Sequence, residues 1–415
     1  MSESVVKGTA GVVVAGAGQA AAQLAQSLRQ GGYGGPVTLV GDEGFLPYER
    51  PPLSKDYLGN KRDAAQLLLR RPEFWAERQV TLRLGQAIVA VNREASNVTL
   101  ADGAILSYEW LVWATGGRPR RLPCPGADLA GVHTIRTIVD IDALKRDLAQ
   151  PRRVVVIGGG YIGLEAAAVL RGMGLPVTVL EAQERLLARV TSPVVSQFFL
   201  DLHRREGVDV RLGAAVRRLT GTERVVGVEL ASGEILPADL VVMGVGIIPN
   251  VQVLATAGLS CPNGVEVDAH CRTNDPHILA IGDCALHPSA HAAVPLRLES
   301  VQNAIDQAKT AAATILGVPQ PYTALPWFWS DQYAVKMQTA GLCLGYDQAV
   351  VRGDASRPPF SVAYLRDGRL IAVDCLSAPK DFMAGKTLIA GQALMDPERL
   401  ADPGVDLKAA RISTE

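Results

Sequence analysis

The segment VVVAGAGQAAAQLAQSLRQGGYGGPVTLVGDE, residues 12–43, sets the architecture of the chain. Residues 12–15 form a short apolar run of the kind that makes a buried parallel strand. Residues 20–30 are rich in strong helix formers and are followed by two glycines, which predicts a helix that ends there. A second apolar run at residues 37–40 is followed by the acidic Asp42. This order of strand, glycine turn, helix, strand and acid is typical of a dinucleotide-binding fold.

The turn between the first strand and the helix has the G-x-G-x-x-A spacing that brings backbone close to a pyrophosphate. Gly16 permits the tight turn, Gly18 lets the backbone approach the phosphates, and the small Ala21 lets helix and strand pack closely. The helix that starts here presents free N–H groups and a partial positive charge to the same phosphates. We therefore expect these three residues to line a dinucleotide site.

The same pattern occurs a second time, and the repetition is more specific than a single match. Residues 154–157 read VVVI and lead into GGGYIG at residues 158–163. A helix is expected to follow, and the strand VTVL at residues 177–180 precedes Glu181. The residues of this second turn that would line a site are Gly158, Gly160, Tyr161, Ile162 and Gly163. Two such units on one chain predict two bound dinucleotides.

Each unit continues with a hairpin and then a glycine-rich crossing segment. In the first unit Asp102-Gly103 separates two β-prone runs, and the strand that follows enters ATGG at residues 114–117. In the second unit Ser232-Gly233 separates two such runs, and the next strand enters GVG at residues 244–246. The crossing segments supply three further candidate cofactor contacts, Thr115, Gly116 and Gly246.

The two acids differ in position, and this bears on the choice of cofactor. Aligning the second strands of the two units places Gly41 opposite Glu181, so Asp42 arrives one residue late. A carboxylate at this point bonds the adenosine ribose of NAD and repels the 2′-phosphate of NADP. Glu181 is therefore expected to favour NADH, although Arg185 lies nearby and could weaken the preference. Asp42 is the candidate for the corresponding ribose ligand of the first unit, although its shifted position fits the pattern less well than that of Glu181.

Composition and charge limit the classes of protein to consider. With 415 residues the chain has room for two or three domains, and its formal net charge of −1 creates no overall field for nucleic acid or acidic membranes. The N-terminus lacks the basic and apolar runs of a signal peptide, and no apolar run is long enough to span a bilayer. A soluble, cytoplasmic protein without nucleic-acid or membrane partners is expected.

The chain contains six cysteines and six histidines. No two cysteines have the C-x-x-C or C-x4-C spacing of a redox-active disulfide, so reduced thiols are expected. His287 and His291 are four residues apart, but Pro288 between them favours a loop over a regular helix. No metal site is therefore expected.

The C-terminal part of the chain has a different character. A strand at residues 278–281 and a helix with Ser300 as its N-cap precede a linker at residues 319–326. Four β-prone runs follow, near residues 333–339, 347–352, 359–366 and 369–376. Asp367-Gly368 marks a hairpin, and a helix is expected from Pro379. These signals predict a small α+β domain.

Seven segments in chain order carry a resemblance to a known family. They are YERPPLSKDYL (48–58), WATGGRPR (113–120), GGGYIGLEAAAVL (158–170), GVGIIPN (244–250), AIGDCA (280–285), RLESVQNA (297–304) and PWFWSDQY (326–333). In these segments the chain resembles the two-dinucleotide flavoprotein reductases, and most closely the ferredoxin reductases of bacterial oxygenase systems. The resemblance implies FAD on the first unit and a nicotinamide dinucleotide on the second.

The resemblance also implies a glutathione-reductase-like α/β fold with two Rossmann-like domains and a small α+β domain. The FAD-binding domain would be discontinuous, comprising residues 1–117 and 247–322. The NAD-binding domain would comprise residues 118–246. The C-terminal α+β domain, residues 323–415, would carry the segment 327–333 toward the flavin.

Lys55 and Glu165 are the catalytic candidates that the resemblance carries over. In the family this lysine lies at flavin N5 and pairs with the glutamate that matches Glu165. A cation there would stabilise negative charge that develops on the reduced ring, and the pairing would avoid a lone buried charge. The alternative is a surface lysine and a glutamate on a helix face. Tyr161, one helical turn before Glu165, matches an aromatic residue that covers the nicotinamide site, with simple packing as its alternative.

Further FAD contacts are implied by position in the family. Asp283 matches a carboxylate used on the ribityl or pyrophosphate region, with an ordinary turn aspartate as the alternative. Val301, near a helix N-terminus, would offer its N–H to the flavin pyrimidine, where the helix dipole stabilises the reduced ring. Trp329 either lies over the flavin or fills a domain interface. The remaining FAD contacts that the resemblance carries over are Ala20, Ile88 and Arg136.

The activity implied by the resemblance is that of an NADH-dependent ferredoxin reductase. NADH would reduce FAD, and electrons would pass singly to a two-iron ferredoxin that serves a haem monooxygenase or a ring-hydroxylating dioxygenase. Alternatives are an NADH oxidase or peroxidase, a rubredoxin reductase, a flavoprotein like apoptosis-inducing factor, and a non-catalytic FAD-binding scaffold. No cysteine precedes Cys124, which argues against a peroxidase with a redox cysteine in the first unit. The near-zero net charge weighs against a nucleic-acid-binding flavoprotein.

Overall fold

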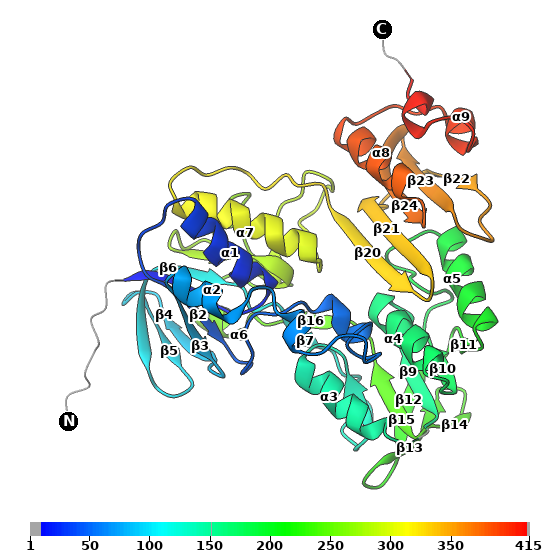
Figure 1. The fold of residues 1–415 in the computed structure, drawn as a ribbon, viewed down its shortest axis with the longest axis horizontal. Coiled ribbons are helices and arrows are strands. Elements are labelled where there is room, and N and C mark those ends of the chain that lie inside the picture. Colours follow the sequence, from blue (N-terminus) through cyan, green and yellow to red (C-terminus); the bar gives the residue numbers. More distant parts are fainter. Residues whose placement is uncertain (1–9, 151, 413–415) are drawn as a thin grey trace. The chain divides into compact units, whose positions relative to one another are not determined.

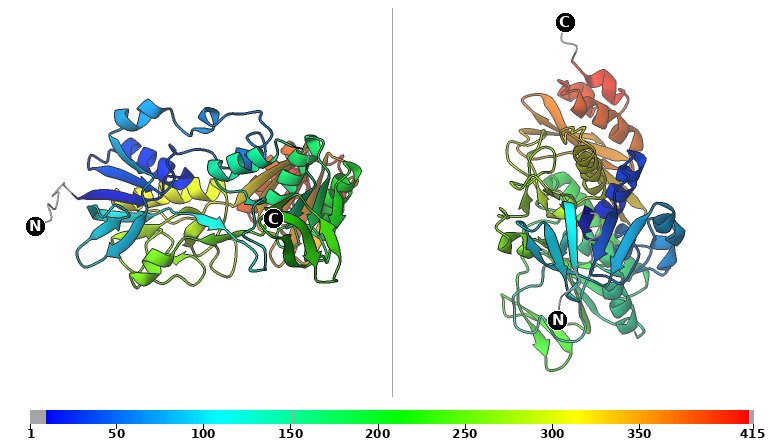
Figure 2. Two further views of the ribbon diagram at one scale, coloured as in Figure 1. Left: turned by 90° about the horizontal axis from the view of Figure 1, so that it is seen from below. Right: turned by 90° about the vertical axis from the view of Figure 1, so that its left-hand side faces the viewer.

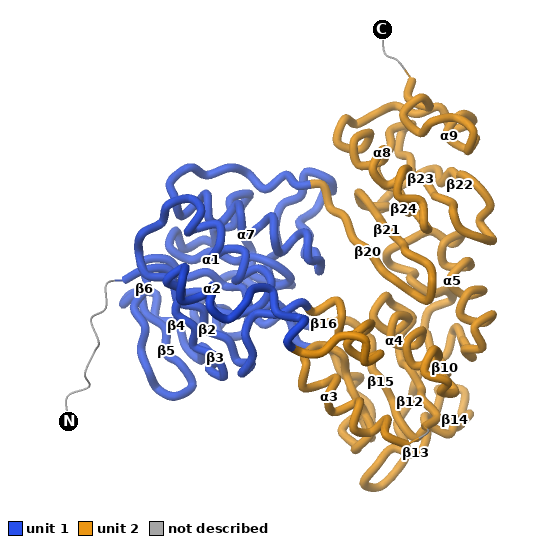
Figure 3. The backbone as a smooth tube through the Cα atoms, viewed as in Figure 1, with its two compact units in different colours: residues 1–49, 65–118, 248–324 blue, residues 50–64, 119–247, 325–415 orange. Residues whose placement is uncertain are grey.

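The structure, a computed structural model, describes residues 10–150 and 152–412. Residues 1–9, where the sequence shows no signal-peptide pattern, lie outside the described residues. The chain forms two compact units, coloured separately in Figure 3. Unit 1 comprises residues 1–49, 65–118 and 248–324, and unit 2 comprises residues 50–64, 119–247 and 325–415. The three domains expected from the sequence, with limits at residues 117, 246 and 322, stay a prediction.

Unit 1 contains the first glycine turn and a seven-stranded sheet. Its strands are β1 (Gly11–Ala15), β2 (Val37–Gly41), β3 (Val80–Leu84), β4 (Ile88–Asn92), β5 (Asn97–Leu100), β6 (Ile105–Trp113) and β18 (Ile278–Ala280). The order is β3-β2-β1-β6-β5-β4, and β18 pairs with β6 off this path. β1 pairs in parallel with β2 and β6, whereas β5 pairs antiparallel with β4 and β6. The predicted hairpin at Asp102-Gly103 is confirmed, because it joins β5 to β6.

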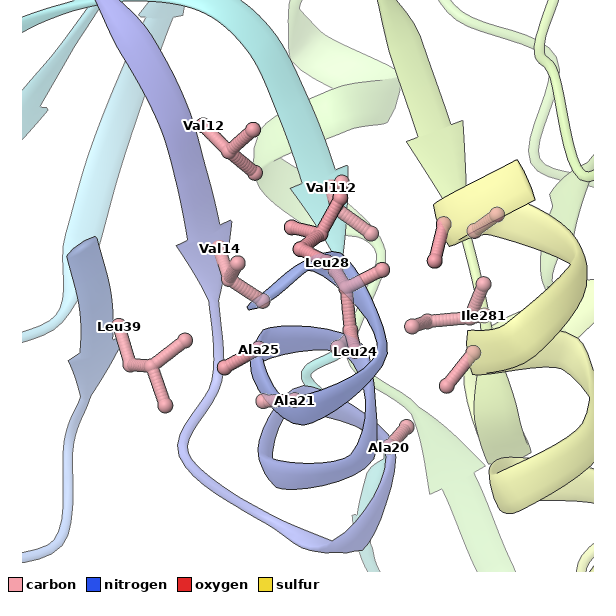
Figure 4. Packing of buried hydrophobic residues seen from close by; sticks show 14 of the residues in the cluster. Val12, Val14, Ala20, Ala21, Leu24, Ala25, Leu28, Leu39, Val112 and Ile281 are labelled. Carbon is pink, nitrogen blue, oxygen red and sulfur yellow. The ribbon is translucent and has the colours of Figure 1, made fainter. Parts of the chain in front are cut away.

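Helices α1 (Gln19–Gln30) and α7 (Val301–Ile315) lie side by side over one face of this sheet (Figure 1), and the views of Figure 2 agree. Successive strand residues point to opposite faces, so Val12 and Val14 pack toward α1 while Val13 packs on the other side. Figure 4 shows Leu24 and Leu28 of α1 in the cluster of buried apolar side chains between the helices and this face of the sheet. Burying each of these leucines contributes about 1.5–3 kcal/mol. The packing holds the glycine turn at the carboxyl end of β1.

Smaller elements complete this part of the chain. They are α2 (Pro72–Glu77), α6 (Gln252–Thr256), β17 (Val265–Glu266), β19 (Ala285–Leu286) and the short 3-10 helices η2 (Ala65–Leu67) and η3 (Gly282–Cys284). The short strands β7 (Gly117–Pro119) and β16 (Ile247–Pro249) fall where the chain passes from one unit to the other. Across residues 10–150 and 152–412, no helix combines the length and apolar character that a membrane crossing requires.

Unit 2 contains the second glycine turn on a five-stranded parallel sheet. Its strands, in the order β11-β10-β9-β15-β8, are β11 (Asp209–Arg211), β10 (Val177–Leu180), β9 (Val154–Ile157), β15 (Leu240–Met243) and β8 (Val132–Thr134). The helices are α3 (Ile138–Asp147), α4 (Tyr161–Gly172) and α5 (Pro193–Arg205). Between β11 and β15 the chain forms a separate antiparallel sheet of β12 (Val216–Gly221), β13 (Val225–Leu230) and β14 (Ile235–Pro237). The predicted hairpin at Ser232-Gly233 joins β13 to β14 and is confirmed.

The C-terminal part of unit 2 is a five-stranded antiparallel sheet with the order β20-β21-β24-β23-β22. Its strands are β20 (Trp327–Gln332), β21 (Val335–Gly341), β22 (Gln348–Gly353), β23 (Phe360–Arg366) and β24 (Arg369–Leu376). Three helices follow, α8 (Pro379–Ala390), α9 (Pro397–Ala401) and the 3-10 helix η4 (Leu407–Ala410). The predicted hairpin at Asp367-Gly368 is confirmed. The α/β fold with Rossmann-like sheets and an antiparallel C-terminal sheet is likewise confirmed.

The predicted strand near residues 333–339 is wrong at its start. β20 ends at Gln332 and β21 begins at Val335, so Tyr333 and Ala334 form the connecting turn. Tyr333 has a φ of 55°, the left-handed conformation that tight hairpins require. An aromatic residue is typical of strands and unusual in this conformation, and the sequence pattern therefore concealed the turn.

A buried polar cluster joins the C-terminal sheet to the start of α5 within unit 2. The Asp374 carboxylate accepts hydrogen bonds from the hydroxyls of Thr191 and Tyr364, the latter at 2.5 Å. The Tyr364 hydroxyl oxygen also lies 3.0 Å from Ser192 Oγ and accepts the Ser192 proton, because the single Tyr364 proton points to Asp374. Burial raises the pKa of the Asp374 carboxyl to about 6, although both donors oppose this shift. The folded protein therefore holds a proton on Asp374 more tightly than the unfolded chain does.

This carboxyl makes a testable contribution to the pH dependence of stability. A raised folded-state pKa stabilises the fold fully below about pH 4, and the contribution is lost as the pH rises through about 6. The difference from the ordinary value corresponds to about 3 kcal/mol. We expect Asp374→Asn to remove this dependence, so the wild-type advantage in unfolding free energy should fall by about that amount from pH 4 to 7. Urea unfolding of both proteins at several pH values measures this change. If the difference in unfolding free energy between wild type and Asp374→Asn is the same at every pH, the Asp374 carboxyl is not the source of the pH dependence.

Candidate functional site

The first glycine turn has the backbone geometry that a dinucleotide site needs. Gly16 has a φ of +113°, and a Cβ atom there would lie 2.3 Å from the carbonyl oxygen of Ala114. A Cβ at Gly18 would meet no described atom within 4 Å, so the backbone is open on that side. Gly18 is also the N-cap of α1, and no side chain of the described residues caps the helix by a hydrogen bond. Uncapped N–H groups beside an open glycine fit a pyrophosphate.

The second turn repeats this geometry in unit 2. Gly158 has a φ of +111°, and its added Cβ would lie 2.4 Å from the carbonyl oxygen of Gly244. Gly160 is the N-cap of α4, and an added Cβ would meet no described atom within 4 Å. A Cβ on Gly163 would lie 2.1 Å from the Gly158 carbonyl oxygen, so only glycine lets α4 approach the turn this closely. Ile162 is exposed at the start of α4. Both turns can therefore hold a phosphate group.

Several predicted FAD contacts gather around the first turn. A Cβ on Gly282, the residue before Asp283, would lie 3.3 Å from Ala20 Cβ, so these two segments are neighbours. Val301 opens α7, where Ser300 accepts a hydrogen bond from the Asn303 N–H at 3.1 Å, and the predicted N-cap is confirmed. The N–H of Val301 belongs to the first helical turn, which has no intrahelical acceptor. An anionic or electron-rich group would be stabilised there.

The other predicted contacts of unit 1 lie in different environments. Thr115 donates its hydroxyl to the Asn250 carbonyl at 2.8 Å, and Gly116 has a φ of 58°. Ile88 is buried in the core beneath the sheet, in β4. Asp42 is exposed one residue beyond the end of β2. Ala21 is fully buried between α1 and the sheet, as its expected packing role requires. The cofactor contacts themselves stay predictions.

Glu181 is held in place at the end of β10. Its carboxylate accepts hydrogen bonds from the N–H groups of Gly159 at 2.7 Å and Gln183 at 2.8 Å. A Cβ at Gly159 would lie 2.5 Å from Leu186 Cδ2 and 2.9 Å from the Glu181 carboxylate, so a larger residue would displace the ends of these side chains. Arg185 donates to the carbonyl oxygens of Thr191 and Ala188 and is therefore engaged in its own loop. The expected weakening of NADH preference by Arg185 has no support in this geometry.

Lys55 and Glu165 form an ion pair within unit 2. Lys55 Nζ lies 3.1 Å from Glu165 Oε1, and the Glu165 side chain is only 2% exposed. The predicted pairing of these residues is thus present, and Lys55, whose side chain is 14% exposed, is not the surface lysine of the alternative. Two hydroxyls complete the site, since Ser54 donates to Oε2 at 2.6 Å and Ser330 donates to Oε1 at 2.7 Å. Burial raises the pKa of the Glu165 carboxyl, while Lys55, Ser330 and Ser54 act in the opposite direction.

Aromatic side chains surround this pair. The Trp329 ring centroid lies 5.7 Å from Lys55 Nζ, within range of a cation–π contact. Trp329 also lies beside Trp327, with ring centroids 5.7 Å apart. Tyr161 packs against Phe328 on the other side of β20, with centroids 4.7 Å apart. The packing of Tyr161 is therefore evident, and a role over nicotinamide stays a prediction.

The segment at residues 50–64 belongs to unit 2, although it follows the first glycine-turn unit in the chain. Pro51–Ser54 form the 3-10 helix η1, which presents Ser54 and Lys55 to Glu165. Tyr57 donates to Asp142 at 2.7 Å and so ties the segment to α3. Arg136 lies just before α3, and its carbonyl accepts a hydrogen bond from Arg50 at 2.6 Å. The predicted FAD contact Arg136 is thus a neighbour of this segment.

The cysteines and histidines form no metal or disulfide centre. All six cysteines lie in the described part of the chain, and each of them is free. Among the described residues, no group of three or more His, Cys, Asp or Glu side chains could hold a metal ion. His287 forms an isolated β-bridge with Leu296 and His291 lies in a turn, so neither belongs to a regular helix, as predicted.

Sequence reasoning missed three residues that shape these sites: Gly159, Ser54 and Ser330. Gly159 occupies the variable position of the glycine motif, where no pattern demands it. Ser330 and Gln332 are polar residues on the buried face of β20, whereas Trp329 and Asp331 are only partly buried. Polar side chains on the buried face of a strand are the signal that would have identified Ser330.

Comparison with known proteins now identifies the family. The chain belongs to the family described as pyridine nucleotide-disulphide oxidoreductase, which matches residues 10–308. Residues 327–411 match a second family, described as reductase C-terminal. The chain is thus an oxidoreductase in which a Rossmann-like core is followed by a C-terminal domain of the kind described for reductases. Family membership implies FAD and a nicotinamide dinucleotide as its cofactors, and both glycine turns have the geometry for them.

Individual relatives are similar over nearly their whole length. A ferredoxin–NAD(P)+ reductase of Sphingomonas sp. is 50% identical over 400 residues, which are 96% of each chain. Putidaredoxin reductase of Pseudomonas putida is 42% identical over 403 residues, again 96% of each chain. Among solved structures, the reductase in the covalent putidaredoxin reductase–putidaredoxin complex matches with a TM-score of 0.93 and 42% identity. That match covers 96% of this chain and 97% of the other.

Proposed function

We propose that the chain is an NADH-dependent ferredoxin reductase that uses FAD to reduce a two-iron ferredoxin. The ferredoxin would in turn serve a haem monooxygenase or a ring-hydroxylating dioxygenase. The observation that carries the proposal is the similarity to reductases whose names specify ferredoxin or putidaredoxin, at 42–50% identity over 96% of the chain. The six free cysteines favour this function over disulfide reduction and suit a reducing compartment, so we place the enzyme in the cytoplasm.

The residues of each unit have separate tasks in this proposal. Gly16, Gly18 and the N-terminus of α1 would hold the FAD pyrophosphate, and Gly158 and Gly160 would hold that of NADH. Bound FAD supplies the conversion of a two-electron hydride transfer into one-electron steps. Lys55, held by the Glu165 carboxylate, would stabilise the negative charge of a reduced ring.

Glu181→Arg is expected to shift the cofactor preference from NADH toward NADPH. The substitution removes a carboxylate that would bond the ribose, and a hydrogen bond to a charged group contributes about 1.5–3 kcal/mol. We therefore expect the KM for NADH to rise about tenfold to a hundredfold, while the KM for NADPH falls.

The control is Glu184→Arg, because Glu184 is an exposed residue of the same loop. It introduces the same charge without removing the carboxylate that binds Gly159 and Gln183. If Glu181→Arg leaves the ratio of kcat/KM for the two cofactors unchanged, Glu181 has no part in selecting them.

The function is tested by NADH-driven reduction of cytochrome c with the purified flavoprotein, with and without a two-iron ferredoxin from the same host. A strong increase on adding ferredoxin is expected, because one-electron transfer then passes through the iron–sulfur protein. Equal NADH consumption without ferredoxin, with oxygen or peroxide as the electron sink, would replace the proposal by an NADH oxidase or peroxidase.

A further inference from the structure

A row of hydrogen bonds leads away from Glu165 into the interior of unit 2. Ser330 Oγ lies 2.7 Å from Glu165 Oε1, and Gln332 Nε2 lies 3.2 Å from Ser330 Oγ. Gln332 Oε1 lies 2.9 Å from His203 Nε2, and His203 Nδ1 lies 3.2 Å from the Tyr333 hydroxyl. The row thus connects α4 with β20, α5 and the β20–β21 turn. Its three central residues are buried.

When Glu165 is ionised, the chemistry of these groups allows one direction along the row. A carboxylate only accepts hydrogen bonds, so the single hydroxyl proton of Ser330 points to Glu165. The Ser330 oxygen then accepts from the Gln332 amide nitrogen, which leaves the amide oxygen facing His203. An amide oxygen cannot donate, and His203 must therefore carry a proton on Nε2.

The other nitrogen of His203 completes the assignment. His203 is 0% exposed, and burial lowers the pKa of its imidazole, so the ring is neutral and carries one proton. With that proton on Nε2, Nδ1 accepts from the Tyr333 hydroxyl. Tyr333, His203, Gln332 and Ser330 therefore all donate toward the Glu165 carboxylate, and each bond polarises the next.

We propose that His203 and Gln332 are positioning residues, which aim the Ser330 hydroxyl at Glu165 and keep this carboxylate ionised beside Lys55. The Gln332 amide donates to the Ser330 oxygen and so fixes the orientation of the hydroxyl. If this donor is lost, the hydroxyl is free to rotate away from Glu165. The stabilisation of a reduced flavin by Lys55 rests on the proposed function. The effect of His203 and Gln332 on Glu165 does not depend on that function. Burial favours the neutral form of the Glu165 carboxyl, and each hydrogen-bond donor shifts the equilibrium back toward the ionised carboxylate.

The remaining charged and titratable groups near the pair oppose ionisation or are neutral. Asp331 Oδ2 lies 3.8 Å from Lys55 Nζ and competes with Glu165 for its charge. Tyr161, one turn before Glu165 in α4, is a neutral phenol at ordinary pH. Lys55, Ser54 and Ser330 are therefore the groups that favour the carboxylate, and only Ser330 is directed by a further row of donors.

The ionisation of Glu165 can be measured directly by NMR. The oxidised, FAD-loaded full-length protein, labelled with carbon-13 at the glutamate carboxyl carbon, is titrated without NADH or ferredoxin. The Glu165 signal is assigned by its loss in Glu165→Gln. Ser330→Ala removes a donor to the carboxylate and should raise the midpoint by about one to two pH units. This variant establishes the size of the direct effect.

The proposal is tested by replacing His203. His203→Phe keeps a ring against Tyr333 but removes the donor, and we expect the Glu165 midpoint to rise by about half a pH unit, a threefold change in the ionisation constant. His203→Gln keeps a donor nitrogen and should restore the wild-type midpoint. In a Ser330→Ala background, His203→Phe should cause no further shift, because the row has already been interrupted.

Nitrogen-15 NMR of the histidines gives a second readout, with the His203 signal assigned by its loss in His203→Phe. We expect a neutral imidazole protonated on Nε2 at pH 7–8. An Nδ1-protonated ring or an imidazolium would overturn the proposal, as would a midpoint unchanged in His203→Phe. A shift that persists in the Ser330→Ala background would overturn it too. Gln332→Met replaces His203→Phe if that variant does not fold. These readouts need no electron transfer, so they are independent of the ferredoxin assay.

Discussion

Lys55→Met is expected to lower the free energy of unfolding of unit 2 by about 3–5 kcal/mol near neutral pH. The substitution removes the charge that lies 3.1 Å from Glu165, whose side chain is buried. Ser54 and Ser330 still donate to the carboxylate, but hydroxyl dipoles do not replace a full opposite charge. Urea unfolding followed by circular dichroism measures the loss.

The pH dependence identifies the origin of this loss. Lys55 lowers the pKa of the Glu165 carboxyl, so its removal leaves that pKa still further above the ordinary value. A group whose folded-state pKa is raised stabilises the fold at low pH and loses this contribution as the pH rises. The deficit of Lys55→Met should therefore be largest above neutral pH and shrink in acid.

Two controls separate the buried charge from the loss of a lysine. Lys55→Met combined with Glu165→Gln should recover most of the stability, because no uncompensated charge remains. Lys309→Met breaks an exposed pair with Asp306 at 2.9 Å and should change the unfolding free energy by about 0.5 kcal/mol or less. A double variant as unstable as Lys55→Met would show that the lysine acts through packing.

Local signals predicted much of the fold. The two glycine turns, the hairpins at Asp102-Gly103 and Ser232-Gly233, and the Ser300 N-cap each depend on residues that are close in the chain. Turn and cap preferences arise from backbone conformation and neighbouring hydrogen bonds, so the sequence is sufficient for them. The pair of Lys55 and Glu165 came from the family resemblance, because 110 positions separate its members.

The rest of the site depends on packing between distant segments. Nothing in the residues 50–64 indicates that they pack against α3 and α4, since their chain neighbours belong to unit 1. Ser330 and His203 are likewise brought to Glu165 and Gln332 by the arrangement of whole helices and strands. Their side chains are polar in buried places, which marks them as unusual but does not reveal their partners. Tyr333 shows the converse, because tertiary structure there overrides a strand preference.

Gly158→Ala is expected to destabilise unit 2 by about 2–5 kcal/mol, through a strained backbone and a close contact. Its φ of +111° is unfavourable for alanine, and the methyl group would lie 2.4 Å from the Gly244 carbonyl oxygen. Because that oxygen belongs to the backbone at the end of β15, it cannot move without disturbing the sheet. Urea unfolding of the variant measures the loss.

Gly160→Ala, two residues further on, should behave in the opposite way. Gly160 has a φ of −84°, and the added methyl group would meet no described atom within 4 Å. Stability should change by about 1 kcal/mol or less, since alanine is only a poorer N-cap than glycine. The methyl group would nevertheless enter the space through which a pyrophosphate approaches the helix, so the KM for NADH should rise about tenfold to a hundredfold.

The pair of variants distinguishes a glycine required by the fold from one required by a ligand. Thermal unfolding and NADH kinetics on both proteins suffice, and Gly16→Ala and Gly18→Ala form the matching pair for FAD retention in unit 1. If Gly160→Ala leaves the KM for NADH unchanged, the second turn does not hold the cofactor phosphates. An unstable Gly160→Ala protein would instead show that this position serves the fold, because the space beside it would then be filled by the protein itself.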